Sequence, residues 1–531
     1  MKSLVDDMDI VVIGSGVAGA LVAKVLAQAK FKVCILEAGP SWTREDAFEN
    51  YKHSTNRTLS SPFPKADWLL SPSQNQYFSQ QGNAEYQPHF IHGVGGTTWN
   101  WTAITPRFLP ADFALKTHYG VAIDWPLTYT DIEPYYVQAE YALGISGDSE
   151  NVHGSPRSKP YPMSAIPMSY ADQVIAKKLK KKGLKVASFP AARNSHSYDG
   201  RPACKGNNMC SPLCPIGASY SANVDVQKAM KAGARLITEA VVFQLDVDGE
   251  RQITAVHYKH PDHSVHVIKG KRFIIACNAI ETARLLLMSK HEQCPNGVAN
   301  ASDQVGRHLM DHHILTWKFD MPEPMFLGRG PQSISTILHG RDGAFRKDYA
   351  AVKFFLGNDL NIQQESSQLL ADDKNWSSIL DKLKDKAMFQ AQIGFEVEQL
   401  PDAKNRVRVE GKRLDPLGLP LPYVDYKLHP YTAKGSKIWR RHTEKLIEFL
   451  GGTITHSAMA LSSHHPSGTT RMGLKEQSSV VDKNCQSHEH QNLYMIGSSV
   501  FPTQGTANPT LTIAALSLRL ADYIKAAAGR K

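Results

Sequence analysis

Three cysteines in one short stretch of the chain are the first residues whose type and spacing suggest chemistry. They are Cys204, Cys210 and Cys214 in "RPACKGNNMCSPLCPIGASY" (residues 201–220), three of the 7 cysteines in the sequence. The stretch is rich in proline, glycine and asparagine, which predicts a loop rather than a helix or strand. Three close thiolates in a loop can hold an iron–sulfur cluster, for which soft thiolate is the preferred ligand.

Two other uses of these thiols stay open on the residues alone. Zinc is one, with His196 as a fourth ligand, although the five residues between the first two cysteines exceed the usual spacing of zinc ligands. A disulfide with one spare thiol is the other. No fourth cysteine is nearby for a four-iron cluster: two are predicted inside core strands (Cys34, Cys277), and two in distant polar loops (Cys294, Cys485).

A second pattern, at the N-terminal end, predicts a dinucleotide site. Residues 10–13 form an apolar run typical of a buried parallel strand, and a G-x-G-x-x-G motif and a helical pattern follow it. Gly14 permits a tight turn, Gly16 lets the backbone approach a pyrophosphate, and Gly19 lets helix and strand pack closely. Glu37 ends the second apolar strand, "KVCILEAG", where a carboxylate suits the hydroxyls of a ribose. FAD and NAD both use this motif.

The composition is that of an ordinary globular enzyme, with 531 residues, 42% hydrophobic and 21% charged. The net charge of +10 is spread along the chain. Its densest run, "KKLKKKGLK" (residues 177–185), predicts the solvated end of a helix, and we expect no nucleic-acid partner. No apolar run reaches the ~18 residues of a membrane span. Acidic residues stand where a secretory signal would be apolar, so we expect no signal on this chain.

Five further motifs, taken in order, resemble the glucose-methanol-choline (GMC) oxidoreductases over nearly the whole chain. They are "GVGGTTWNWTA" (93–103), "FIIACNAIETARLLLMS" (273–289), "VGRHLMDHH" (305–313), "SSHHPSGTTRMG" (462–473) and "NLYMIGSSVFPTQGTANPTLTIAALSLRLADYI" (492–524). The resemblance implies FAD as the cofactor. It carries flavin contacts over to Gly14, Ser15, Gly16, Val17, Ala18, Gly19, Glu37, Ala38, Gly95, Gly96, Thr98, Asn100, Trp101, Val241 and Thr510.

Two positions depart from the family's pattern. Some relatives attach the flavin covalently through a histidine in the glycine-rich turn, and the matching residue here is Asn100, which implies non-covalent FAD. Many relatives also have an acidic residue where this chain reads Gly-Ser-Ser at 497–499, so that flavin contact is not carried over.

The cysteine stretch is similar to an insertion in the catalytic subunits of bacterial membrane-linked sugar dehydrogenases of the glucose, fructose and gluconate type. This resemblance implies that Cys204, Cys210 and Cys214 hold a three-iron [3Fe-4S] cluster that relays electrons. It favours the cluster over zinc and over a disulfide.

The family uses a histidine as the base that takes the proton of the substrate hydroxyl. Aligning on "SGTTRMG" assigns this role to His465, with His464 either beside the site or facing solvent. The second member of the pair aligns with Asn508, whose amide can donate to the substrate oxygen but cannot act as a base. Glu398 falls where some relatives place a carboxylate in the pocket, either binding a sugar hydroxyl or standing in the wall.

The expected fold is α/β, with a discontinuous Rossmann-like FAD-binding domain and an antiparallel-sheet substrate domain over the flavin. The FAD-binding domain is assigned residues 1–112, 224–316 and 456–531. An insertion covers residues 113–223 and includes the cysteine loop (about 190–220). The substrate-binding domain is assigned residues 317–455.

The resemblance implies a dehydrogenase that oxidises a sugar or polyol hydroxyl and passes electrons singly through the cluster to a cytochrome or quinone. An oxidase of the same family and a sugar-acid dehydrogenase are the alternatives. Relatives work on the periplasmic side of the inner membrane with a small subunit that carries the export signal and a membrane-bound multihaem cytochrome c. We expect the same partners here, with a cytosolic enzyme as the alternative.

Overall fold

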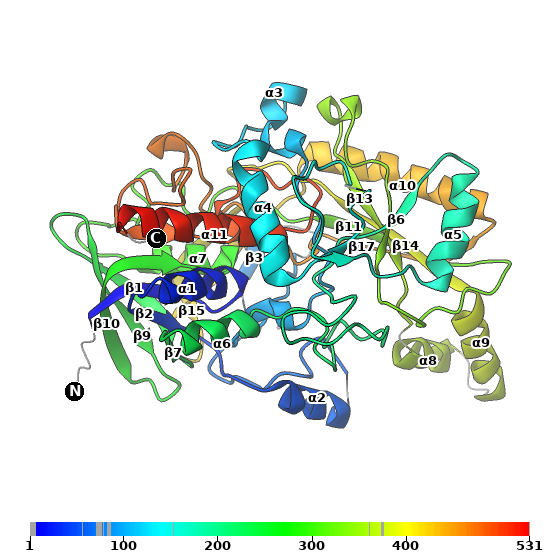
Figure 1. Cartoon of the computed structure of the whole chain (residues 1–531), viewed down its shortest axis with the longest axis horizontal. Coiled ribbons are helices and arrows are strands. Elements are labelled where there is room, and N and C mark those ends of the chain that lie inside the picture. Colours follow the sequence, from blue (N-terminus) through cyan, green and yellow to red (C-terminus); the bar gives the residue numbers. More distant parts are fainter. Residues whose placement is uncertain are drawn as a thin grey trace.

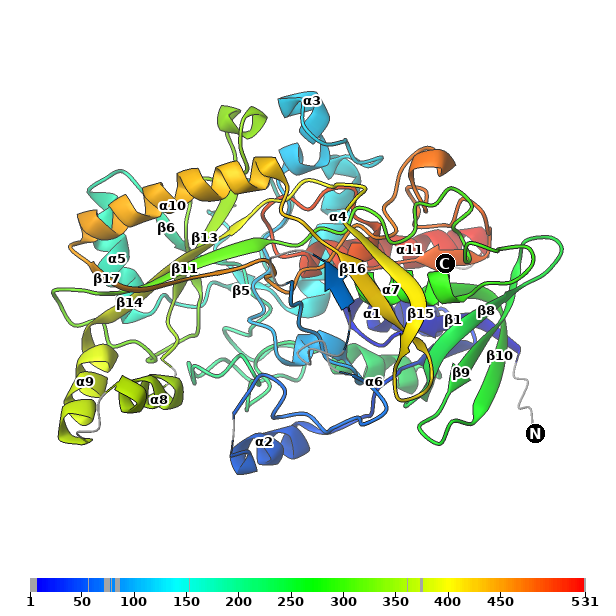
Figure 2. The ribbon, with the colours of Figure 1, turned by 180° about the vertical axis from the view of Figure 1, so that it is seen from behind.

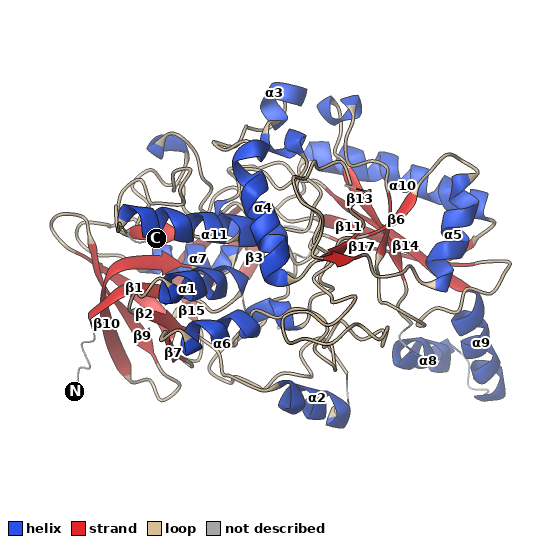
Figure 3. Cartoon of the chain, viewed as in Figure 1, coloured by secondary structure: helices blue, strands red, loops and turns tan. Residues whose placement is uncertain are grey.

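The computed structural model describes residues 7–55, 57–70, 77, 79–81, 86–151, 153–360, 362–372 and 376–529. Two sheet-based halves lie side by side along the long axis of the molecule, as Figure 1 shows. Helices and strands occur in both halves (Figure 3), so the α/β class predicted from the sequence is confirmed. None of the helices in the described ranges is long and apolar enough to cross a membrane.

The first half is built on a seven-stranded sheet in the order β7-β2-β1-β10-β9-β8, with β18 paired to β10. Its strands are β1 (Asp7–Ile13), β2 (Val33–Leu36), β7 (Arg235–Ile237), β8 (Val241–Val247), β9 (Ile253–Lys259), β10 (Val265–Ile275) and β18 (Leu493–Met495). The pairs β7–β2, β2–β1, β1–β10 and β10–β18 are parallel. Strand β9 pairs antiparallel with β10, and β8 pairs antiparallel with β9, which continues the sheet. Ile13, Leu36 and Ile275 lie in register at the carboxyl edge, where parallel sheets form binding crevices.

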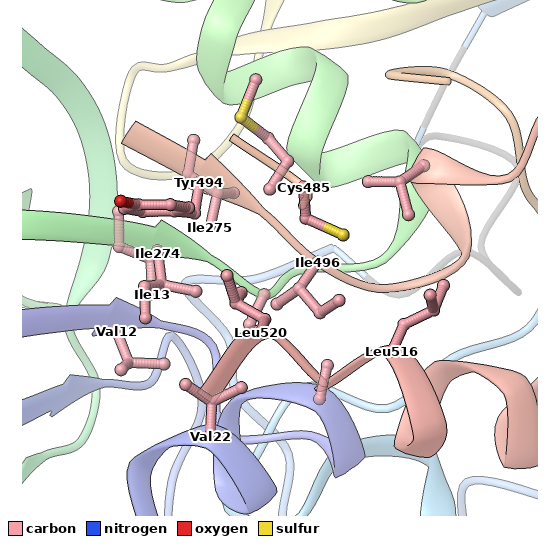
Figure 4. Close-up of a cluster of buried hydrophobic side chains, with 14 of the residues drawn as sticks. Val12, Ile13, Val22, Ile274, Ile275, Cys485, Tyr494, Ile496, Leu516 and Leu520 are labelled. Atoms are coloured by element: carbon pink, nitrogen blue, oxygen red, sulfur yellow. The ribbon is translucent and has the colours of Figure 1, made fainter. Parts of the chain in front are cut away.

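Helices from distant parts of the sequence cover this sheet. Helix α1 (Val17–Gln28) packs on α6 (Asn223–Lys231) and on α11 (Thr510–Ala527), and α4 (Tyr129–Leu143) packs on α11. Figure 4 shows the core between strand and helix, where Val12 and Ile274 lie near Val22 and Leu520. Helix α11 is buried along most of its length and packs on α1, which brings the C-terminal segment beside the N-terminal helix.

The second half is built on a six-stranded antiparallel sheet in the order β17-β11-β14-β13-β12-β6. Its strands are β6 (Val186–Ser188), β11 (His313–Asp320), β12 (Ser335–Ile337), β13 (Val352–Gly357), β14 (Gln390–Val397) and β17 (Thr453–Ala460). Strand β6 comes from a segment well before the others and pairs with β12 at one edge. The register sets Lys353 directly opposite Glu396.

The long helix α10 (Pro430–Leu450) packs on this sheet and is seen clearly across it in Figure 2. A proline in its first turn and Gly451, with φ of +80°, mark its ends. The other helices of this half are α3 (Leu115–Tyr119), α5 (Tyr170–Lys180), α8 (Ile362–Asp372) and α9 (Trp376–Phe389). The lysine-rich run predicted to end a helix does so at the end of α5.

The remaining elements are smaller. They are α2 (Arg44–His53), α7 (Ala279–Met288), β3 (Ser79–Gln81), β4 (Ser146–Gly147), β5 (Met163–Ser164), β15 (Arg406–Leu414), β16 (Pro420–Asp425), and the 3-10 turns Gly96–Trp99, Pro110–Phe113, Ala344–Lys347, Glu476–Ser478 and Ser498–Val500. Strands β15, β16 and β3 form a third sheet. The segment between β6 and α6, which holds the cysteine stretch, is coil with isolated β-bridges, as its composition predicts.

Candidate active site

One cavity of about 540 Å³ reaches from the carboxyl edge of the parallel sheet to the antiparallel sheet. We call the side formed by the glycine motif and the end of β2 the nucleotide wall. The opposite side, formed by side chains of the antiparallel sheet, is the substrate wall; its members are Ile314, Lys353, Phe355 and Glu396. The segment 463–466 and Asn508 lie between the two walls.

The nucleotide wall presents mainly backbone to the cavity. Gly14 has a φ of +100°, and helix α1 begins after Gly16 with no side-chain cap, which leaves its first N–H groups for an anion. Glu37 accepts hydrogen bonds from the Ser15 N–H (3.0 Å), the Ser15 hydroxyl (2.5 Å) and the Gly39 N–H (3.0 Å). The carboxylate thereby fixes the glycine turn.

Most of the residues carried over as flavin contacts line this cavity. They are Gly14, Ser15, Gly16, Val17, Ala18, Glu37, Ala38, Gly96, Thr98, Asn100, Trp101, Val241 and Thr510. Gly19 lies behind the lining, where a Cβ would approach the Gly14 carbonyl oxygen to 2.0 Å, so glycine is required for the packing of helix on strand. Gly95 donates its N–H to the Ser15 hydroxyl (3.2 Å) and so connects the two glycine-rich turns.

His465 and Asn508 lie together in the cavity, with His465 Nε2 3.3 Å from Asn508 Nδ2. On its other side, His465 Nδ1 is 3.0 Å from Nδ1 of His312, whose Nε2 is 3.0 Å from the Gly505 carbonyl oxygen. Because a carbonyl only accepts, the proton of neutral His312 is on Nε2 and its Nδ1 accepts. His465 therefore donates from Nδ1, and its Nε2 keeps a lone pair toward Asn508 and the cavity.

The environment of His465 favours a neutral base. Burial lowers the pKa of His465 well below its usual value, and the Glu396 carboxylate opposes this shift only in part. The imidazole is therefore unprotonated at neutral pH, as a general base must be.

A buried carboxylate that sequence reasoning did not select shapes the histidine loop. Asp311 accepts hydrogen bonds from the N–H groups of His312 (2.7 Å), Ser463 (3.1 Å) and His465 (3.0 Å), and from the Ser462 hydroxyl (2.7 Å). The available signal was its place in "VGRHLMDHH", beside two histidines.

His464 faces the cavity from the loop, with its Nδ1 accepting a hydrogen bond from the His89 N–H (2.9 Å). Its φ of +65° turns it away from the direction of His465. His464 therefore lines the cavity beside the site, and its side chain is also exposed.

The carboxylate predicted for the substrate pocket, Glu398, lies outside the cavity. It is fully buried and pairs with Arg346, with its second oxygen accepting from the Tyr431 hydroxyl (3.2 Å). Since burial requires a partner for the charge, Arg346 fixes Glu398 in the fold. The carboxylate that lines the cavity is Glu396, two residues earlier in the chain.

Cys277 corrects a second expectation, since it follows β10 instead of lying inside it. Its thiol donates to the Ile13 carbonyl (3.4 Å) and lines the cavity at the carboxyl edge of the sheet. Cys294 and Cys485 lie outside helices and strands, as expected for loops, and both are buried against the hydrophobic core. Cys34 is buried within β2, as predicted.

The cysteine loop borders the same cavity. Cys204, Cys210 and Cys214 form no disulfide; Cys210 and Cys214 are buried, and Cys204 is half-buried. Ser211 lines the cavity directly after Cys210. Burial raises the pKa of Cys210 to about 11, although Arg193 opposes the shift.

Arg193 is fully buried beside this loop. Its guanidinium donates to the carbonyls of Thr102 and Gln332 and, within the described ranges, makes no ion pair. Arg44 donates to the Cys214 carbonyl (2.6 Å). Arg193 already lies close enough to the buried Asp359 to oppose the rise in the pKa of that carboxyl. The positive charges of Arg193 and of the half-buried Arg44 also suit an anionic group held by the thiols.

A single metal ion fits the three thiols less well than a cluster does, because their sulfur atoms do not all lie within 4.8 Å of one another. In the described part of the chain, the only three ligating side chains whose ligand atoms all lie within 4.8 Å of one another are His312, Glu396 and His465. The histidines of that group already bond to each other and Glu396 is paired with Lys353, so we assign it to proton chemistry.

Comparisons with known proteins agree with this geometry. Models of the GMC oxidoreductase family match residues 8–314 and 401–517. The fructose dehydrogenase large subunit of Gluconobacter japonicus is 36% identical over 529 residues, 97% of each chain. The gluconate 2-dehydrogenase flavoprotein of Pantoea cypripedii is 24% identical, covering 98% of this chain and 93% of that one. The 2-methyl-1,2-propanediol dehydrogenase of Mycolicibacterium austroafricanum is 27% identical, covering 99% and 96%.

Solved structures share the fold. A formate oxidase superposes with a TM-score of 0.69 at 15% identity, covering 98% of both chains. The pyridoxine 4-oxidase of Mesorbium loti superposes with a TM-score of 0.64 at 16% identity, covering 97% of this chain and 99% of the other.

Proposed function

The chain belongs to the GMC oxidoreductase family, and from that premise we propose the reaction of its active site. The protein is an FAD-dependent dehydrogenase that acts on CH–OH groups of sugars or polyols. The observation that carries this function is the pair of His465 and Asn508 in a cavity that also contains a complete dinucleotide-binding wall.

The residues of the pair have different tasks in the reaction. His465 Nε2, with its lone pair toward the cavity, takes the proton of the substrate hydroxyl. Asn508 Nδ2 donates a hydrogen bond to the same oxygen as negative charge develops on it. FAD held along the nucleotide wall would supply the acceptor for the hydride of the substrate carbon. His312 holds the proton of His465 on Nδ1 and so keeps Nε2 available.

A panel of sugars, polyols and sugar acids with an artificial electron acceptor tests this function. We expect turnover with at least one sugar or polyol. Turnover restricted to aldonic acids would support the sugar-acid dehydrogenase alternative, and turnover coupled to O₂ consumption would support an oxidase. No turnover with any CH–OH donor by FAD-loaded protein would refute the assignment.

We propose that FAD is bound non-covalently. The turn position that could carry a flavin-linked histidine is Asn100, whose Nδ2 lies 2.9 Å from His89 Nε2. Glu37 would hold the ribose, and the N-terminus of α1 the pyrophosphate. Precipitation with denaturing acid should release FAD into the supernatant; flavin that stays on the polypeptide would contradict the proposal.

We also propose that Cys204, Cys210 and Cys214 hold a [3Fe-4S] cluster. The three-thiol donor set, the buried Arg193 and the position of Ser211 in the cavity lining support it. Such a cluster would supply a one-electron relay between the active site and an external acceptor. Anaerobically purified protein should contain iron and acid-labile sulfide, and Cys210→Ser should lose iron while keeping FAD. Zinc or no metal in the wild type would rule the cluster out.

The partner proteins and the location are further proposals. We propose a small subunit that carries the export signal, and a membrane-bound multihaem cytochrome c that accepts electrons on the periplasmic side of the inner membrane. The name of the 36%-identical relative, a large subunit, supports the existence of partners. Expressing the chain alone and with its neighbouring reading frames, followed by fractionation, tests this. Activity confined to the cytosol in both cases, with no co-purifying chain, would support the cytosolic alternative.

A further inference from the structure

A lysine is buried in the substrate wall with two partners. Lys353 lies in β13, its side chain is 2% exposed, and it lines the cavity. Its ammonium contacts the carboxylate of Glu396, which stands directly opposite on β14, and the amide oxygen of Asn508. No step of the proposed reaction yet uses Lys353.

The ammonium determines which end of the Asn508 amide faces the cavity. The two ends of an amide have the same shape, so its orientation follows from the hydrogen-bonding groups around it. Lys353 can only donate, so the amide oxygen must face it. The Nδ2 group is then left toward His465 Nε2 (3.3 Å) and the cavity. A carboxylate at position 353 would hold the amide in the opposite orientation.

Glu396 balances the charge of Lys353. Burial alone would raise the pKa of Glu396, but the Lys353 ammonium lowers it and leaves the carboxylate ionised. Its other oxygen accepts a hydrogen bond from the Ser463 hydroxyl (2.7 Å), two residues before His465. The ion pair is thus connected to both members of the catalytic pair.

We propose that Lys353 is a positioning residue for hydroxyl oxidation, which orients the Asn508 amide and strengthens its N–H donor. The positive charge at the amide oxygen polarises the amide, and hydrogen bonds in series strengthen one another. The donor therefore meets the developing alkoxide already oriented, which is how preorganised groups lower a barrier. This inference rests on the proposed oxidation of a hydroxyl group by His465 and Asn508.

A double-mutant cycle tests whether Lys353 acts through Asn508. The variant K353M/E396Q removes both charges, so no uncompensated ion is left in the wall. With the best donor of the substrate panel, we expect the rate of FAD reduction to fall about 10²-fold, at the low end of the loss of one oxyanion donor. Adding Asn508→Ala should change the rate by less than about threefold from Asn508→Ala alone, because residues that act as one unit are not additive.

Two readouts separate positioning from a structural role. The oxidised product carries a carbonyl that accepts the same hydrogen bond, so calorimetry should show weaker product binding in K353M/E396Q. The matched variant Lys353→Arg keeps the charge and the donor and should keep the rate within about tenfold. FAD content and the thermal midpoint should stay near wild type in both K353M/E396Q and Lys353→Arg.

The pH dependence gives a further check. The charged and titratable groups that face His465 are Glu396, Lys353, His312 and His464. Lys353→Met alone leaves the Glu396 anion unbalanced, which raises the pKa of His465. The acid limb of the kcat/KM profile should therefore move to higher pH in Lys353→Met and return in K353M/E396Q.

The outcomes are distinguishable. A wild-type protein with FAD that oxidises no donor contradicts the proposed function itself. An active wild type with K353M/E396Q within threefold of it, or with effects that add to those of Asn508→Ala, overturns the role of Lys353. If K353M/E396Q loses FAD, Lys353→Gln replaces it in the cycle; loss of FAD from both variants would make Lys353 a structural residue and also overturn the proposal.

Discussion

The two walls of the cavity act through different parts of the chain. The nucleotide wall uses backbone N–H groups, a helix N-terminus and one carboxylate, all within residues 13–39. The substrate wall uses side chains from separate strands, and it meets His465 and Asn508 from two further segments. The first wall is therefore set by local spacing, and the second by tertiary packing.

This difference predicts two classes of variant. Changes in the nucleotide wall should weaken FAD binding and leave the turnover of FAD-loaded protein near normal. Changes in the substrate wall and the catalytic pair should reduce turnover while FAD stays bound. A variant that does both would show that the walls are mechanically coupled.

The largest effect is expected for His465→Ala. Loss of a general base costs about 10²–10⁴ in turnover, and FAD content should not change. His464→Ala is the matched control from the adjacent position; it should reduce turnover by less than about tenfold, because Nδ1 of His464 only accepts from the His89 N–H. Steady-state kinetics with an artificial acceptor measures both. The reverse result, with His464→Ala the more damaging, would place the base one residue earlier.

How much of the site could be predicted from the sequence also differs between the nucleotide wall and the substrate wall. The strand, glycines, helix and acidic residue at the N-terminus all lie as predicted, because each is fixed by its neighbours along the chain. The coil around the cysteines could also be predicted, since proline and glycine determine it locally. Asn508 and His465 were selected by resemblance to a family and not by spacing.

The substrate wall could not be predicted in this way. Glu396 and Glu398 lie on the same face of one extended segment, two residues apart, so the pattern of the strand does not distinguish them. Arg346, from a distant turn, pairs with Glu398 inside the fold and leaves Glu396 for the cavity. Lys353 gave no signal, because Asn508, which it orients, is 155 residues away. His312 lies in the motif "VGRHLMDHH", but its pairing with His465, 153 residues away, could not be read from that motif.

A change in the nucleotide wall should have the next largest effect. Glu37→Ala removes the acceptor of the Ser15 and Gly39 N–H groups and of the ribose. Because hydrogen bonds to a charged group contribute about 1.5–3 kcal/mol, the Kd for FAD should rise about 10²-fold. Fluorescence titration of the apoprotein measures this Kd. The kcat at saturating FAD should stay within about threefold of wild type, and a kcat loss like that of His465→Ala would contradict the separation of the walls.

A smaller effect is expected when the partner of His465 is removed. His312→Phe takes away the acceptor that holds the proton on His465 Nδ1, and the loss of one such hydrogen bond costs about tenfold in kcat. His312→Asn places an amide oxygen near the position of Nδ1 and should recover most of that loss. A rate for the asparagine variant no better than for the phenylalanine variant would argue against the tautomer derived from Gly505.

The smallest effect concerns the two neighbouring carboxylates and is a shift in pH dependence. The Glu396 anion raises the pKa of His465 against the effect of burial, so Glu396→Gln should lower that pKa further. The base then stays unprotonated to lower pH, and the acid limb of the kcat/KM profile moves to lower pH. Glu398→Gln is the control: it disturbs the ion pair with Arg346 and should reduce the thermal midpoint, but the acid limb should stay in place because Glu398 does not line the cavity. A limb that shifts in Glu398→Gln and not in Glu396→Gln would mean that Glu398, and not Glu396, is the carboxylate that acts on His465.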